Sequence, residues 1–189
     1  TMLIPAAVDL FNGSSDWKAF SSAAFLTGST GITLVLTNRA GPIFLGIRLM
    51  FVLTTLSWAL IAAFGAIPFA LADLGLSYTD ALFESMSGIT TTGSTVLTGL
   101  DTAPPGILLW RALLQWLGGI GIIVMAVAVL PLLQVGGMQL FKTDSSGAEK
   151  ILPKTIEVAT TIIAIYIILT LVCGSIYWLQ GISTISYTH

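Results

Sequence analysis

The chain has few charged residues. Only 8% of its 189 residues are Asp, Glu, Lys or Arg, whereas 55% are hydrophobic. A soluble domain carries roughly a quarter of its residues as charges, so this composition excludes an ordinary water-exposed surface. The mean hydropathy of +0.95 points the same way. The chain therefore belongs in a lipid bilayer, with membrane lipid as its surroundings.

Basic residues and cysteine are also scarce. The formal net charge is −2, which leaves no basic surface for nucleic acid, and a nucleic-acid partner is excluded. The single cysteine, Cys173, lies inside an apolar run, where a disulfide or a thiolate metal site is not expected. No nucleophile and base pair, ligand cluster or nucleotide loop is visible in the sequence. We therefore expect no enzyme, no catalytic residues and no bound cofactor.

Long apolar runs dominate the chain instead. Roughly 20 apolar residues suffice to cross a bilayer, and four stretches meet that length: residues 17–37, 46–72, 106–132 and 156–179. Residues 1–11 are apolar but too short to cross. We interpret them as the end of a further helix whose beginning precedes this sequence. A turn at Asp9, Asn12, Gly13 and Ser14 would close it.

The link between the second and third spans contains a short amphipathic segment, residues 77–87. Ser77 is a predicted N-cap, and Asp80 is a first-turn capping residue. One helical face would hold Tyr78, Ala81, Leu82, Ser85 and Met86. Such a helix is about 15 Å long, half the hydrocarbon thickness of about 30 Å. We therefore predict a half-helix that enters the membrane and returns to the same side.

The basic residues support this arrangement. Five of the seven would share one face if the segment is re-entrant: Arg39, Arg48, Lys142, Lys150 and Lys154. The positive-inside rule makes that face cytoplasmic. If the short helix crossed the membrane, the two basic loops would lie on opposite sides.

A threonine-rich loop follows the half-helix. Residues 88–95 read Gly-Ile-Thr-Thr-Thr-Gly-Ser-Thr, a poor helix former at membrane depth. Rings of backbone carbonyls from Thr and Gly loops replace the hydration shell of potassium in channels. We predict that Thr90, Thr91, Thr92 and Gly93 present carbonyl oxygens to a cation, and glycine permits the positive φ that this requires. A surface loop rich in Thr and Gly is the alternative.

The sequence also contains three features with more than one possible role. Glu84 below the membrane surface pairs with Arg111, or both side chains reach back to the interface. Asp101 is an outer-mouth charge or a turn former. The glycines Gly118, Gly119 and Gly121 lack the lysine of a phosphate loop, so we interpret them as packing residues, where the third span passes the loop.

Several motifs together resemble a known family. They are Phe-Glu-Ser-Met-Ser-Gly-Ile-Thr-Thr-Thr-Gly-Ser-Thr from residue 83, Trp-Arg at 110, Leu-Gln-Trp-Leu-Gly-Gly-Ile-Gly-Ile-Ile-Val from 114, and Leu-Pro-Leu-Leu-Gln-Val-Gly-Gly-Met-Gln-Leu-Phe from 130. The combination is similar to the first repeat of the Trk/Ktr/HKT potassium transporters, of the TrkH type. The resemblance covers nearly the whole chain to about residue 181.

The resemblance implies an all-α membrane fold built from four repeats of helix, pore helix, filter loop and helix around one potassium pathway. Residues 1–45 would be the remains of two extra helices and residues 46–133 the first repeat. Residues 134–153 would be a cytoplasmic loop, and residues 154–189 the first helix of an incomplete second repeat. The filter would be Thr90, Thr91, Thr92 and Gly93, with K⁺ as transported ion rather than cofactor. Glycine at 93 implies potassium, since serine there accompanies sodium permeation in related proteins.

The family also implies partners and a location. Its membrane subunit is a homodimer in the bacterial inner membrane, and it docks a cytosolic, nucleotide-binding TrkA-like regulatory subunit at the cytoplasmic face. Potassium symport is the implied activity. On residue chemistry alone, the favoured interpretation of residues 134–154 is a solvated linker whose lysines only set topology, and a docking surface is the alternative. Two further hypotheses stay open: a subunit of a homotetrameric cation channel, and a non-conducting membrane scaffold.

Overall fold

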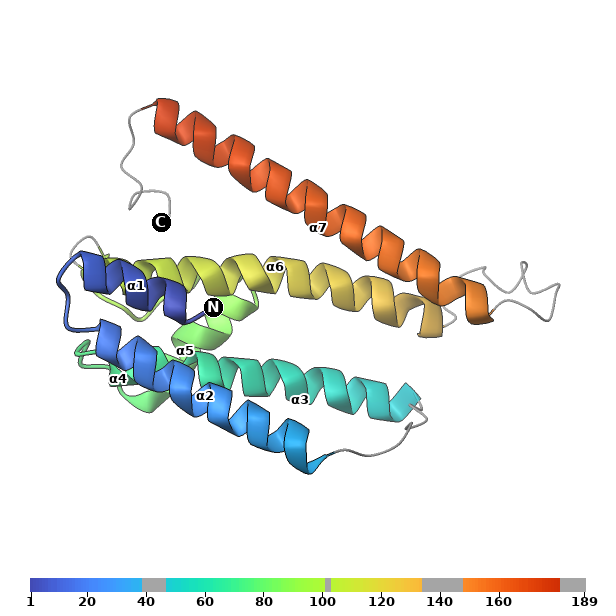
Figure 1. Ribbon diagram of the computed structural model, residues 1–189, viewed down its shortest axis with the longest axis horizontal. Helices are drawn as coiled ribbons and strands as arrows, with labels where there is room; N and C mark the ends of the chain where they lie inside the picture. Colours follow the sequence, from blue (N-terminus) through green and yellow to red (C-terminus); the bar gives the residue numbers. More distant parts are fainter. Residues whose placement is uncertain (39–46, 101–102, 134–147, 181–189) are drawn as a thin grey trace. The chain divides into compact units, whose positions relative to one another are not determined.

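The computed structural model is built from helices (Figure 1). It describes residues 1–38, 47–100, 103–133 and 148–180, and no β-strand occurs among them. The helices are α1 (Leu3–Phe11), α2 (Trp17–Thr37), α3 (Ile47–Gly65), α4 (Ile67–Leu71), α5 (Tyr78–Ile89), α6 (Pro105–Leu133) and α7 (Ala148–Leu179). The predicted all-α class is therefore confirmed.

Four helical segments are long and apolar enough to cross a bilayer, within the part of the chain that the structure describes. They are Trp17–Thr37, Phe51–Leu71, Pro105–Ile123 and Thr160–Tyr177. Each lies inside or within a residue of one of the four predicted spans. Helix α7 begins at Ala148, so it includes residues that the sequence predicted as the end of the loop 134–153. Most of that loop and Asp101 lie outside the described residues.

The chain divides into two compact units after Gly118. The first unit holds α1 to α5 and the beginning of α6, and the second holds the rest of α6 and α7. In the second unit, large apolar side chains such as Ile168, Leu171 and Val172 are exposed, as expected for a lipid-facing helix. The first unit contains residues 90–93, which the sequence predicts as the filter.

Helix α1 ends in the predicted turn. Gly13 has a φ of +72°, and the Ser14 amide donates to the carbonyl of Asp9 at 3.0 Å, the hydrogen-bond pattern of a Schellman motif. Asp9 differs from the prediction because it lies within α1 and its side chain is fully buried. Its Oδ1 accepts a 2.7 Å hydrogen bond from the amide of Gly106. Asp9 thus caps one of the amides at the start of α6 that have no partner within the helix.

Small residues bring the helices of the first unit close together. Three alanines have no exposed surface: Ala62 in α3, Ala66 directly after α3, and Ala81 in α5. The larger Phe20 of α2 packs edge-on against Trp110 of α6, with ring centroids 6.2 Å apart. Close approach through small side chains is the usual way for helices to associate in lipid, where apolar burial alone gives little advantage.

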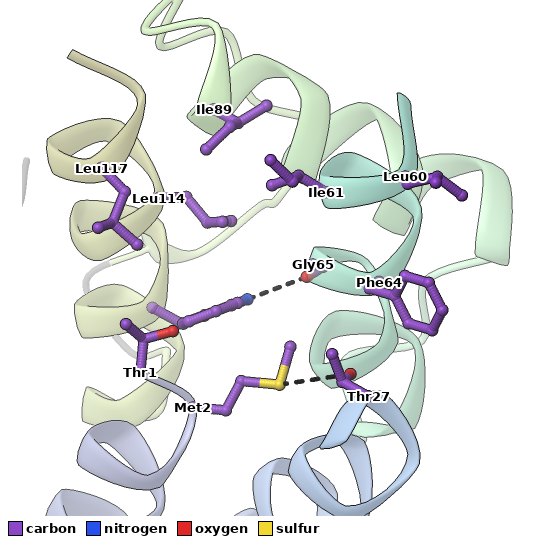
Figure 2. A pocket seen from close by; sticks show the side chains of 11 residues that line it. Thr1, Met2, Thr27, Leu60, Ile61, Phe64, Gly65, Ile89, Leu114 and Leu117 are labelled. Atoms are coloured by element: carbon purple, nitrogen blue, oxygen red, sulfur yellow. Dashed lines mark hydrogen bonds between the residues drawn. The ribbon is translucent and has the colours of Figure 1, made fainter. Parts of the chain in front are cut away.

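Gly65 marks the point where three helices meet. Its carbonyl accepts a 3.0 Å hydrogen bond from Nε1 of Trp110 in α6, the dashed line that reaches Gly65 in Figure 2. A Cβ at Gly65 would lie 2.5 Å from Oγ of Ser85 in α5. An apolar cavity of about 270 Å³ borders this point and extends to Ile89, the last residue of α5 (Figure 2). The end of α3 therefore lies beside the first turns of α6.

Candidate ion-binding loop

Helix α5 begins as the sequence predicts. Oγ of Ser77 accepts from the Asp80 amide at 3.2 Å, and Oδ2 of Asp80 accepts from the Ser77 amide at 3.2 Å. These two bonds form a capping box, so both predicted roles are confirmed. The helix has 12 residues, or about 18 Å, too short to cross a bilayer of about 30 Å.

The buried face of α5 is shifted from the predicted one. Ala81 and Ser85 are buried and Leu82 is half-buried, as expected, but Tyr78 and Met86 are exposed. Glu84 is buried, with 1% of its surface exposed. The hydrophobic pattern failed here because a polar side chain with internal partners can occupy the inner face.

The last residue of α5 lies against the middle of α6. A Cβ at Gly118 would overlap the carbonyl oxygen of Ile89, the last residue of α5. Gly118 lies 13 residues after Pro105, about 20 Å along α6. The chain then returns, because residues 95–97 are bonded to Glu84 in the middle of α5. The half-helix is therefore re-entrant, and Gly118 packs where α6 passes its end, as the sequence predicted.

The C-terminus of α5 closes with the bonds of a Schellman motif. The Thr91 amide donates to the carbonyl of Gly88 at 2.9 Å, and the Thr92 amide donates to that of Ser87 at 3.0 Å. The central position of this motif is left-handed and is usually glycine. Here it is Thr91, with a φ of +58°. A β-branched residue in this region is a strained outlier, and such residues gather at functional sites.

The four candidate ligand residues form an exposed loop, residues 90–93, which we call the threonine loop. Gly93 has the positive φ that was predicted, +79°, and the space where its Cβ would be is open. The hydroxyls of Thr90 and Thr92 are 2.8 Å apart. Among the described residues, none donates a hydrogen bond to the carbonyl oxygens of the threonine loop. These oxygens are free to accept other partners.

A returning segment, residues 94–97, is bound to α5. Oγ of Ser87 donates to the carbonyl of Ser94 at 2.6 Å. Oε1 of Glu84 accepts from Oγ1 of Thr95 and the amide of Val96, both at 2.5 Å, and from the amide of Leu97 at 3.2 Å. Glu84 therefore holds the returning segment to α5, a role that was not predicted from the sequence.

Glu84 also pairs with Arg111, which decides between the two alternatives for these residues. Nε of Arg111 lies 3.0 Å from Oε2 of Glu84, and the two side chains are 9% and 0% exposed. Neither side chain reaches back to the interface. One carboxylate thus links the half-helix, the returning segment and α6.

The oxygen atoms available to a cation here belong to the backbone and to hydroxyls. No group of three or more His, Cys, Asp or Glu side chains that could hold a metal ion occurs in the described ranges. The negative end of the α5 dipole lies at the threonine loop, which favours a cation over an anion.

Comparisons with known proteins agree with this arrangement. A family model described as "TrkH: Cation transport protein" matches residues 17–188. The chain is 45% identical over 184 residues to the Trk system potassium uptake protein TrkI of Halomonas elongata, and 42% identical over 185 residues to TrkH of Escherichia coli K12. Both alignments cover 96% of this chain but only 37% and 38% of the relatives.

A solved structure has a similar fold over nearly the whole chain. The crystal structure of the potassium transporter TrkH from Vibrio parahaemolyticus superposes with a TM-score of 0.82 at 36% identity, covering 99% of this chain and 38% of that one. The chain therefore spans less than two fifths of the length of the relatives that it matches. By its family match over most of its length, the chain belongs to the TrkH family of cation transport proteins.

Proposed function

We propose that this chain contributes one selectivity-filter loop to a potassium uptake protein of the bacterial inner membrane. The observation that carries the proposal is the threonine loop itself. Its carbonyl oxygens accept no hydrogen bond from the described residues, and it follows a half-helix whose last residue lies against Gly118, about 20 Å along the bilayer-length helix α6. Unbonded carbonyls at that depth are tolerated where they line a watery cavity or bind an ion.

Potassium binding would use the backbone of Thr90, Thr91, Thr92 and Gly93. A potassium ion loses its hydration shell in such a filter, and carbonyl dipoles replace the water oxygens. The C-terminal end of α5 adds negative potential at the same place. Because the ion exchanges one set of oxygens for another, it binds strongly enough to enter and weakly enough to leave. No covalent chemistry is needed, so the role is transport rather than catalysis.

One loop supplies only part of a ring of carbonyls. The relatives named as potassium uptake proteins are more than twice as long as this chain. We therefore propose that three further loops complete a pseudo-fourfold pore in a full-length protein. That protein would act as a symporter and form a homodimer in lipid. A TrkA-like, nucleotide-binding subunit would dock at its cytoplasmic face, the side that the basic residues predict for the loop 134–153. The family resemblance supports these partners.

The proposal is tested by Gly93→Ser in the full-length transporter. Serine adds a Cβ at a φ of +79° and a hydroxyl beside the carbonyls, so we expect the preference for K⁺ over Na⁺ to be lost. The measurement is the ratio of K⁺ to Na⁺ flux into proteoliposomes.

The matched control is Gly75→Ser, which has a φ of +65°, open space around the Cβ position and a place outside the loop. It carries the same backbone strain, about 1–2 kcal/mol, without touching the threonine loop. Retained selectivity in Gly93→Ser, or an equal loss in Gly75→Ser, would count against the proposed filter.

A further inference from the structure

Glu84 lies in α5, shortly before the threonine loop, and its hydrogen bonds join α5 to two other segments, the returning segment and α6. Building on the proposed function, we infer that Glu84 is a positioning residue for the filter. Its ionised carboxylate holds the returning segment at a fixed distance from α5 and thereby sets the selectivity for K⁺ over Na⁺. Arg111 fixes the direction of that carboxylate. Glu84 binds no ion itself; it acts through the backbone of residues 94–97.

The partners of Glu84 are all hydrogen-bond donors. Oε1 accepts from the Thr95 hydroxyl and from the amides of Val96 and Leu97, and Oε2 accepts from Nε of Arg111. An ionised carboxylate has about four lone-pair sites and no donor, so it matches four donors. A glutamine of the same size would turn its NH₂ group toward one of these donors. Beside Arg111, the site therefore requires a group with acceptor positions for all four donors and no donor of its own, which an ionised carboxylate provides and a glutamine does not.

The threonine loop is anchored on both sides within a few residues. At its first residues, the amides of Thr91 and Thr92 are bonded to the carbonyls of Gly88 and Ser87 in the last turn of α5. After it, the Ser94 carbonyl is held by Ser87, and the next three residues are bonded to Glu84. Thr92 and Gly93 thus lie between two fixed ends. A movement of the returning segment would move their carbonyls directly.

Burial makes the anchor stiff. Glu84 has 1% of its surface exposed and Arg111 has 7%, so water competes little for their hydrogen bonds. Breaking a buried pair by neutralising one partner leaves the other charge without compensation. The pair also links α5 and the returning segment to α6.

The test uses three variants of the full-length transporter in proteoliposomes, with K⁺ and Na⁺ fluxes measured in each. Glu84→Gln removes the charge and keeps the size. The double variant Glu84→Gln with Arg111→Gln places a side-chain oxygen of residue 111 where Nε of the arginine lies. The NH₂ group of the glutamine at position 84 then has an acceptor. The oxygen of the same glutamine still faces the returning segment. Ser77→Ala weakens the capping box at the far end of α5 and controls for lost stability.

We expect Glu84→Gln to reduce the K⁺ to Na⁺ flux ratio by about tenfold or more, the effect of one lost charge-assisted hydrogen bond. The double variant should recover most of that ratio, which a general loss of packing would not allow. Ser77→Ala should lower the melting temperature and leave the ratio within about twofold of wild type. An unchanged ratio in folded Glu84→Gln would overturn the inference.

Two further outcomes remain informative. If Glu84→Gln does not fold, Thr95→Val removes one donor to Glu84 at nearly constant volume. We expect this variant to fold and to have a lower K⁺ to Na⁺ flux ratio than wild type. A wild-type ratio would contradict the inference. If the wild type itself shows no preference for K⁺, the proposed function fails independently of Glu84. The two failures are therefore distinguishable.

Discussion

At the scale of single residues, the same helix-capping motif occurs twice with a different residue at its left-handed position. Helix α1 and helix α5 both end with Schellman hydrogen bonds, but the left-handed position is Gly13 in the first and Thr91 in the second. Glycine reaches this conformation without steric cost, whereas threonine does not. The strained residue is the one in the threonine loop, where a rigid backbone would hold carbonyls in place.

We predict that Thr91→Gly raises the stability of the full-length transporter by about 1 kcal/mol, because removing the Cβ relieves the strain. The gain is partly offset by the greater freedom of glycine in the unfolded chain. Selectivity for K⁺ should fall, since the loop becomes more flexible. Thermal unfolding in detergent and flux measurements would check both effects.

The reciprocal change, Gly13→Thr, provides the control. A side chain at Gly13 meets nothing within 4 Å, so the only penalty is the backbone conformation. We expect a loss of about 1–2 kcal/mol with unchanged selectivity. A destabilised Thr91→Gly variant would contradict the strain that we assign to Thr91.

Local chemistry made some residues predictable and others not. Ser77 and Asp80 were identified because a capping box depends on residues three apart in sequence. The positive φ of Gly93 was expected for the same kind of reason. That of Thr91 was not, because no local signal marks a threonine for this conformation. Asp9 was taken for a turn residue, since its partner Gly106 is 97 positions away.

At the scale of helices, glycines determine how deep α5 enters. A Cβ at Gly118 would overlap Ile89, and a Cβ at Gly88 would approach Leu114 at 3.0 Å. The end of α5 can therefore lie directly against the backbone of α6. The sequence predicted the packing role of Gly118 from its glycine-rich surroundings, but the buried face of α5 needed the partners of Glu84 to be known.

We predict that Gly118→Ala destabilises the protein by about 1–3 kcal/mol and reduces potassium flux, because the helix end and its loop must move away from α6. The matched control is Gly28→Ala in α2, where a Cβ meets nothing within 4 Å. That change should be neutral or slightly stabilising, since alanine favours a helix. Melting temperature and flux together test this, and equal behaviour of the two variants would refute the close contact at Gly118.

At the scale of the whole molecule, the chain accounts for about 38% of the solved potassium transporter that it resembles. The span pattern and the re-entrant half-helix were predictable from hydropathy and charge, because a bilayer restricts backbone geometry severely. In the proposed pore, the carbonyls of this loop would meet those of the three further loops. In the assembled protein, potassium binding would therefore depend on the backbone of Thr90, Thr91, Thr92 and Gly93.

The most direct test is a crystal structure of the full-length transporter grown in rubidium, which replaces potassium and scatters anomalously. We predict an anomalous peak at coordination distance from the carbonyl oxygens of the threonine loop, lost when sodium replaces rubidium. A peak elsewhere in the pore, with these carbonyls bonded only to water or protein, would contradict the claim that this loop binds the transported ion.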